Sequence, residues 1–145
     1  MLHLTSPAVA SGGRIPERHT CDGRNEELPL VWGGVPAGAK SLALVCSDPD
    51  APRGTFHHWA VYDIPPDAIG LPARGAHEAV NDFGQPGYGG PCPPRGHGPH
   101  HYHFRLYALD VPTLSLGPRT RCADVEQAAR RHAIAEADLV ALYSR

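Results

Sequence analysis

The stretch "HHWAVYDIPP" (residues 57–66) carries a two-residue repeat that ends at a pair of prolines. Positions 58, 60 and 62 would share one face of a strand, and positions 59, 61 and 63 the other. Because successive side chains of a strand point to opposite faces, His57 and His58 should face opposite ways. The stretch therefore predicts a core strand that begins with two histidines.

Two further strands follow from similar patterns. The apolar run "SLALVC" (41–46) breaks off at "SDPDAP" (47–52), and "HYHFRLYALDVP" (101–112) again alternates before a proline. Glycine and proline number 16 each, which is typical of many short elements joined by turns. Six of those glycines and five prolines fall within residues 81–100, beside Phe83 and Tyr88. Such a long connection with aromatic residues favours an ordered, functional loop over a disordered one.

A helix is expected only at the C-terminus. The stretch "RCADVEQAARRHAIAEADLVALYSR" (121–145) is rich in alanine and contains no glycine or proline. Positions 125, 128, 129 and 132 follow a helical stripe. A chain of 145 residues suits one domain, so residues 1–145 are expected to form a mainly β domain with one or two C-terminal helices.

Composition excludes several classes of protein. The formal net charge is −2 and the 13 Lys and Arg residues are dispersed, so nothing indicates nucleic-acid binding. No apolar run is long enough for a transmembrane segment, and residues 1–13 lack the pattern of a secretory signal.

The four cysteines have no paired spacing. We expect reduced thiols in a cytoplasmic protein, with a single disulfide left open.

Titratable side chains gather where the predicted strands begin or end. Asp48 and Asp50 follow one strand, His58 begins the next, and His100 and Tyr102 begin a third. Imidazolium, phenol and the N–H groups of a glycine-rich loop are donors that suit a phosphate or sulfate. Each residue alone has an ordinary structural explanation, such as a solvated turn for "DPDAP". Together they predict a binding site for an anion.

Four motifs occur in the order found in the phosphatidylethanolamine-binding protein family, which this chain resembles along nearly its whole length. They are "DPDAP" (48–52), "HHW" (57–59), "GYGGPCPP" (87–94) and "GPHHYHF" (98–104). The resemblance is strongest to the family's bacterial branch of Raf kinase inhibitor-like proteins. It implies a sandwich of two antiparallel sheets and a site for phosphate or a phospholipid head group. The ligand-binding residues it implies are Asp48, Asp50, Pro52, His58, Gly90, Cys92, Pro93, His100 and Tyr102. His101 stands where the family usually has arginine, which leaves the nearby loop looser or pH-dependent.

The function expected from these observations is non-catalytic binding of a small anionic or phosphorylated ligand, without a cofactor. One alternative is a hydrolase with Asp48 or Asp50 as base, although no activated nucleophile is evident. Another is a metal protein with Asp48, His58 and His100 as ligands. A third is an inhibitor of a kinase or protease that acts through an outer face. A phosphorylated protein as partner and a homodimer also stay open.

Overall fold

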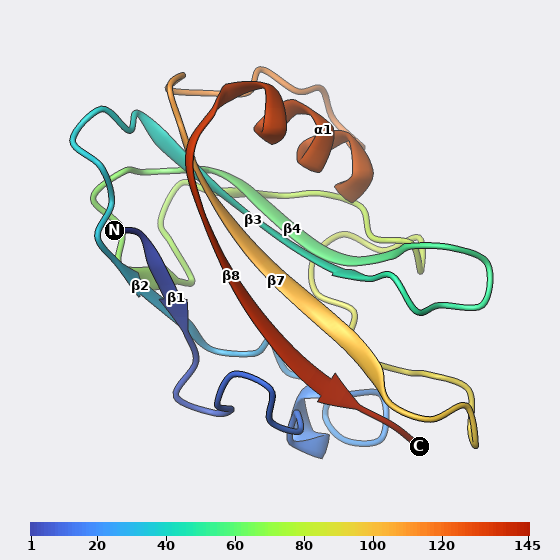
Figure 1. The fold of residues 1–145 in the computed structure, drawn as a ribbon. Coiled ribbons are helices and arrows are strands. Elements are labelled where there is room, and N and C mark those ends of the chain that lie inside the picture. Colours follow the sequence, from blue (N-terminus) through green and yellow to red (C-terminus); the bar gives the residue numbers. More distant parts are fainter.

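The computed structural model describes residues 1–145 as two antiparallel sheets and one α-helix (Figure 1). The elements in chain order are β1 (His3–Thr5), η1 (Glu17–His19), β2 (Leu30–Gly33), β3 (Ser41–Asp48), β4 (Phe56–Ile64), β5 (Gly70–Leu71), β6 (His77–Glu78), β7 (His100–Leu109), α1 (Cys122–His132) and β8 (Ala133–Tyr143). The strands predicted at 41–46, 57–64 and 101–109 are all present. The predicted mainly β fold class is confirmed.

The larger sheet has the strand order β6-β4-β3-β7-β8, and the smaller sheet has the order β1-β2-β5. β3 lies at the centre of the larger sheet, and every one of its residues is buried. An uninterrupted apolar run such as "LALVC" is what a strand covered on both faces requires. The polar residues of β3 are therefore left at its ends, and Asp48 is the last of them.

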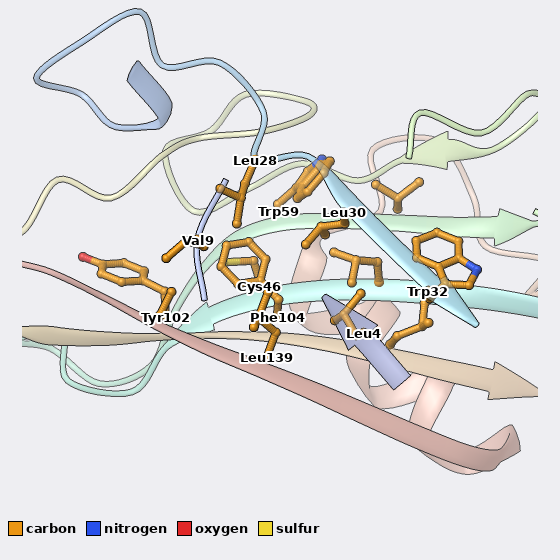
Figure 2. Close-up of a cluster of buried hydrophobic side chains, with 14 of the residues drawn as sticks. Leu4, Val9, Leu28, Leu30, Trp32, Cys46, Trp59, Tyr102, Phe104 and Leu139 are labelled. Atoms are coloured by element: carbon orange, nitrogen blue, oxygen red, sulfur yellow. The ribbon is translucent and has the colours of Figure 1, made fainter. Parts of the chain in front are cut away.

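Each face of the larger sheet has its own core. One face packs against the smaller sheet through a cluster that includes Leu4, Leu30, Trp59 and Phe104 (Figure 2). The other face packs against α1 through a smaller cluster that includes Val125. α1 is eleven residues long, and it has neither the length nor the hydrophobicity to span a bilayer.

The predicted C-terminal helix is present as α1, but it covers only about half of the stretch 121–145 that was expected to be helical. α1 ends at His132, and Ala133 begins β8, which pairs with β7 along nearly its whole length. The burial of β8 has a period of two, with Leu139, Ala141 and Tyr143 facing the core. The hydrogen bonds and burial offered by β7 outweigh the helical preference of alanine.

A β-bulge in β4 corrects the predicted alternation around the two histidines. Cys46 pairs with Trp59 and Ser47 with His57, so His58 is an extra residue without a partner on β3. His58 therefore lies on the same side of the sheet as Trp59, where its ring is 5.3 Å from that of Tyr102. His57 faces the opposite side and hydrogen-bonds Glu126 of α1, as the adjacent histidines predicted. A bulge of this kind commonly redirects a side chain at a site.

Candidate functional site

A cavity of about 200 Å³ lies where β3 ends and where β4 and β7 begin. Strand pairing explains why these ends meet. Ser47 of β3 is opposite both His57 of β4 and His103 of β7, because both neighbours run antiparallel to β3. The residues that line the cavity are Asp48, Ala51, Pro52, Phe56, His58, Phe83, Cys92, Pro93, Pro94, His100 and Tyr102.

Asp48 and His100 form a buried, hydrogen-bonded pair in the wall of the cavity. The Nδ1–H of His100 donates to Oδ2 of Asp48 at 2.6 Å, and the two residues are only 2% and 3% exposed. The other oxygen of Asp48 accepts the backbone N–H of Asp50 at 2.8 Å. Both carboxylate oxygens therefore already have protein donors. The role that this leaves for Asp48 is to orient the imidazole of His100.

His58 and Tyr102 provide the remaining polar atoms of the cavity. Nδ1–H of His58 donates to the carbonyl oxygen of Gly89 at 2.7 Å, so in neutral His58 the Nε2 atom carries no proton. Burial lowers the pKa of His58 below its ordinary value, which favours this neutral form. Tyr102 is fully buried, and its hydroxyl has no hydrogen-bond partner within the protein. Burial also raises the pKa of Tyr102, so its hydroxyl keeps its proton and can donate it to a ligand.

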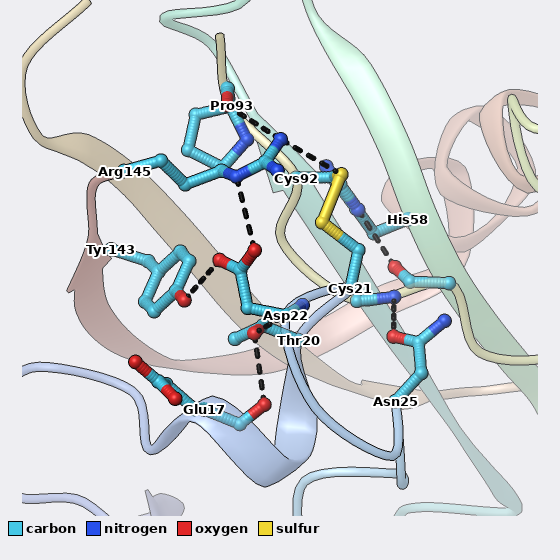
Figure 3. Close-up of a disulfide and its surroundings, with 12 residues drawn as sticks. Glu17, Thr20, Cys21, Asp22, Asn25, His58, Cys92, Pro93, Tyr143 and Arg145 are labelled. Carbon is cyan, nitrogen blue, oxygen red and sulfur yellow. Dashed lines mark hydrogen bonds and ion pairs between the residues drawn. A yellow bond between two sulfur atoms is a disulfide. The ribbon is translucent and has the colours of Figure 1, made fainter. Parts of the chain in front are cut away.

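One wall of the cavity is attached to the rest of the molecule by a disulfide. Cys21 and Cys92 are bonded across 71 residues of sequence (Figure 3). Arg145, at the end of the chain, pairs with Asp22 at 3.2 Å (Nε to Oδ1), and its Nη1 lies 3.5 Å from the sulfur of Cys92. The loop that carries Cys92 and Pro93 is thereby held against the segment around Cys21 and against the C-terminal residue Arg145.

This disulfide corrects the expectation of four reduced thiols. Folding brings the Cα atoms of Cys21 and Cys92 to 5.4 Å, a separation that suits a disulfide. Cys46 and Cys122 are free and buried in the two cores, as apolar strand and helix positions suggest. The prediction of a cytoplasmic protein rested on reduced cysteines and loses that support.

Seven of the nine residues implied by the resemblance line the cavity. They are Asp48, Pro52, His58, Cys92, Pro93, His100 and Tyr102. Asp50 and Gly90 do not line it. Their roles in ligand binding, like those of the other seven, stay predictions.

The carboxylate of Asp50 instead accepts the backbone N–H and the ring Nδ1–H of His101, each at 2.8 Å. The backbone hydrogen bond from His101 lowers the pKa of Asp50. His101 therefore hydrogen-bonds to Asp50 at the position where the family usually has arginine.

Gly90 holds the glycine-rich loop against an earlier part of the chain. Its N–H donates to Oδ1 of Asn25 at 2.9 Å. A Cβ atom at this position would lie 2.3 Å from both that oxygen and the carbonyl oxygen of His19. Only glycine allows the two segments to approach so closely.

Four lining residues are absent from the set predicted from the sequence. They are the apolar residues Ala51, Phe56, Phe83 and Pro94. The rings of Phe56 and Phe83 are 4.7 Å apart, and Phe83 also lies 5.5 Å from His58. Phe83 could have been identified from the sequence, because it is an aromatic residue within a loop rich in glycine and proline. Phe56 differs from ordinary core residues only in its position directly before the two histidines.

The arrangement also bears on the alternatives. No group of three or more histidine, cysteine, aspartate or glutamate side chains is placed to hold a metal ion. Asp48, His58 and His100, the proposed ligands, are instead hydrogen-bonded to protein groups. The sulfur of Cys92 belongs to a disulfide and cannot act as a thiolate nucleophile.

Comparison with known proteins gives a consistent result. The family model for phosphatidylethanolamine-binding proteins matches residues 5–144. A UPF0098 protein of Methanothermobacter thermautotrophicus is 47% identical and aligns over 99% of both chains. The putative lipoprotein LppC of Mycobacterium tuberculosis is 43% identical, over 98% of this chain and 72% of its own length.

Among solved structures, that of Escherichia coli YbcL, described as a member of the mammalian family, superposes with a TM-score of 0.94. It is 34% identical and covers 99% of this chain and 98% of its own. Both the sequence and the fold agree with the resemblance identified from the four motifs. The chain belongs to the phosphatidylethanolamine-binding protein family.

Proposed function

We propose that this protein binds a small anion, such as phosphate or the phosphate of a phosphorylated ligand, in the cavity between β3, β4 and β7. The observation that carries the proposal is the hydroxyl of Tyr102. It is buried, lines the cavity and has no partner within the protein. A buried polar group without a partner is rare because it loses its hydrogen bonds to water. An anionic oxygen in the cavity would accept the missing hydrogen bond.

The size and composition of the cavity support a small ligand. Its volume of about 200 Å³ is below the roughly 300–1,000 Å³ of sites for drug-sized molecules. Tyr102 and a protonated His58 would donate charge-assisted hydrogen bonds to an anion. The phenylalanines and prolines of the wall exclude water from these bonds, which strengthens them.

Binding without catalysis is the second part of the proposal. Both oxygens of Asp48 accept protein N–H groups and the sulfur of Cys92 lies in a disulfide, which argues against Asp48 as a base and Cys92 as a nucleophile. A kinase, a protease or a phosphorylated protein as partner stays a prediction of the resemblance alone.

The test is a calorimetric titration of the protein with phosphate and with phosphoethanolamine. We expect both to bind with similar affinity, because each oxygen of Asp48 already accepts an N–H group of the protein and is a poorer partner for the ammonium of the second ligand. Tyr102→Phe should weaken phosphate binding by at least about 10-fold, since a hydrogen bond to a charged group is lost. Its stability should stay unchanged or rise, because the deleted hydroxyl has no partner in the protein.

Tyr88→Phe is the matched control. Its hydroxyl donates to the carbonyl oxygen of His19 at 2.7 Å and does not line the cavity. This variant should lose stability but keep its affinity for phosphate. Equal phosphate affinity in the Tyr102 variant and the wild type would contradict the proposal, as would the absence of binding in both.

Anion affinity should rise as the pH falls. Nε2 of His58 needs a proton to donate to an anion, and burial lowers the pKa of His58 in the free protein. A bound anion raises that pKa, so binding takes up a proton. Affinity should therefore increase as the pH falls through the pKa of the bound state, and level off below the pKa of the free state.

Sulfate is the suitable probe, because it stays a dianion where phosphate itself titrates. We expect its affinity to rise by up to about 10-fold per unit between about pH 7 and about pH 5. In His58→Gln the side chain at this position no longer titrates, so the dependence should become weaker. A wild-type affinity that is flat or falls toward acid would exclude His58 as the proton acceptor.

The disulfide supports an oxidising compartment. Disulfides persist in secreted and periplasmic proteins and are rare in the cytosol of most organisms. The name of the mycobacterial relative, a putative lipoprotein, is consistent with such a location. We therefore favour an oxidising compartment over the cytoplasm expected from the cysteine spacing.

A further inference from the structure

His100 lines the cavity of the proposed anion site, yet neither of its ring nitrogens is free. Nδ1–H donates to Asp48 at 2.6 Å. Nε2 lies 2.6 Å from Nδ1 of His97, and the two rings are 4.8 Å apart. An imidazole has only two polar atoms. An anionic oxygen accepts hydrogen bonds, so it can bond to His100 only at a protonated Nε2, and only after the ring of His97 has moved away.

The ring of His97 can move away from His100 at little energetic cost. It is an exposed residue, and no protein group other than His100 bonds to its ring. Gly96 and Gly98 flank it with φ values of 76° and 85°, in the left-handed region that glycine adopts without strain. No atom lies within 4 Å of where a Cβ would be at either glycine, so the turn has open space around it. The movement would break one ring–ring hydrogen bond and little else.

We propose that His97 is a gate on the anion site: its ring occupies Nε2 of His100 in the free protein and is displaced when an anion binds. This inference rests on the proposed anion-binding function and adds a residue outside the cavity that regulates it. Because the gate competes with the ligand, the apparent affinity is the affinity of the open site multiplied by the fraction of molecules in which His97 has moved away from His100.

Removal of the gate should strengthen binding. In His97→Ala, Nε2 of His100 has no competing partner, so the affinity for inorganic phosphate should rise by about 2- to 10-fold, the equivalent of one hydrogen bond. A residue that merely supported the site would weaken binding when removed. His101→Ala is the matched control, since this neighbouring exposed histidine bonds to Asp50 and not to His100. It should not tighten binding.

A second measurement follows the gate directly in the wild type. The scalar coupling between Nδ1 of His97 and Nε2 of His100, transmitted through their hydrogen bond, should be present in ¹⁵N NMR spectra of the free protein. It should vanish at saturation with phosphate. Calorimetry of the wild type, His97→Ala and His101→Ala should be performed on the same samples.

The outcomes separate the gate from the site itself. If neither the wild type nor His97→Ala binds phosphate, the proposed function is wrong and the gate falls with it. If the wild type binds but His97→Ala binds equally or more weakly, the site stands and the gate is wrong. Persistence of the coupling at saturation also rejects the gate. Tighter binding in His97→Ala alone, with loss of the coupling, supports it.

Discussion

Loss of the Cys21–Cys92 disulfide is expected to lower the free energy of unfolding by about 4 kcal/mol. The bond closes a loop across 71 residues, and the entropy of the unfolded chain rises by this amount when such a loop is opened. The double variant Cys21→Ser/Cys92→Ser should therefore unfold at a much lower concentration of guanidinium chloride. The variant also loses the attachment that holds one wall of the cavity.

The control for this experiment is the reductant. A dithiol should destabilise the wild type to the level of the double variant and leave the variant itself unchanged. After unfolding, alkylation should label only Cys46 and Cys122 in the oxidised protein, and all four cysteines after reduction. Equal unfolding midpoints for the oxidised wild type and the double variant would show that the bond does not stabilise the fold.

The second large effect is expected for Asp48→Ala, which should cost about 3 kcal/mol of stability. Asp48 is 3% exposed, and it accepts hydrogen bonds from the ring of His100 and from the backbone of Asp50. Its removal leaves both donors without a partner, each at a cost of about 1–3 kcal/mol. Denaturant unfolding measures this loss, and the NMR signal of the Nδ1 proton of His100 should broaden or disappear.

Asp50→Ala is the natural comparison, because the two aspartates stand two residues apart. The carboxylate of Asp50 is 40% exposed and pairs with the exposed His101. Such a surface pair contributes little, so this variant should lose less than about 1 kcal/mol. Similar losses for the two aspartates would mean that the Asp48–His100 pair does not stabilise the strand ends.

Much of the site could be predicted from the sequence because its residues lie next to regular strands. The prolines after residue 46 mark where β3 stops, and antiparallel pairing brings this end beside the beginnings of β4 and β7. The family motifs then identified which side chains matter. The same local patterns could not separate Asp48 from Asp50, since the chain turns after Asp48 and a period of two no longer applies.

The C-terminus shows how a correct local signal can still mislead. Alanine is abundant through residues 122–137, yet the helix stops at His132. The stretch "AIAEADLVALY" (133–143) also alternates small or apolar residues with larger or charged ones, a strand pattern that the helical interpretation overlooked. β7 decides between the two, because an unpaired β7 edge would leave its hydrogen-bonding groups exposed.

By itself the sequence determined the central strands, the Gly- and Pro-rich loop and the titratable residues at the strand ends. These depend on backbone geometry and side-chain periodicity within a few residues. Only the tertiary structure decided the bulge that redirects His58, the Cys21–Cys92 bond, the strand at the C-terminus and the contact between His97 and His100. Each of these depends on which strand or loop lies opposite, and that choice is made by packing of the whole chain rather than by neighbouring residues.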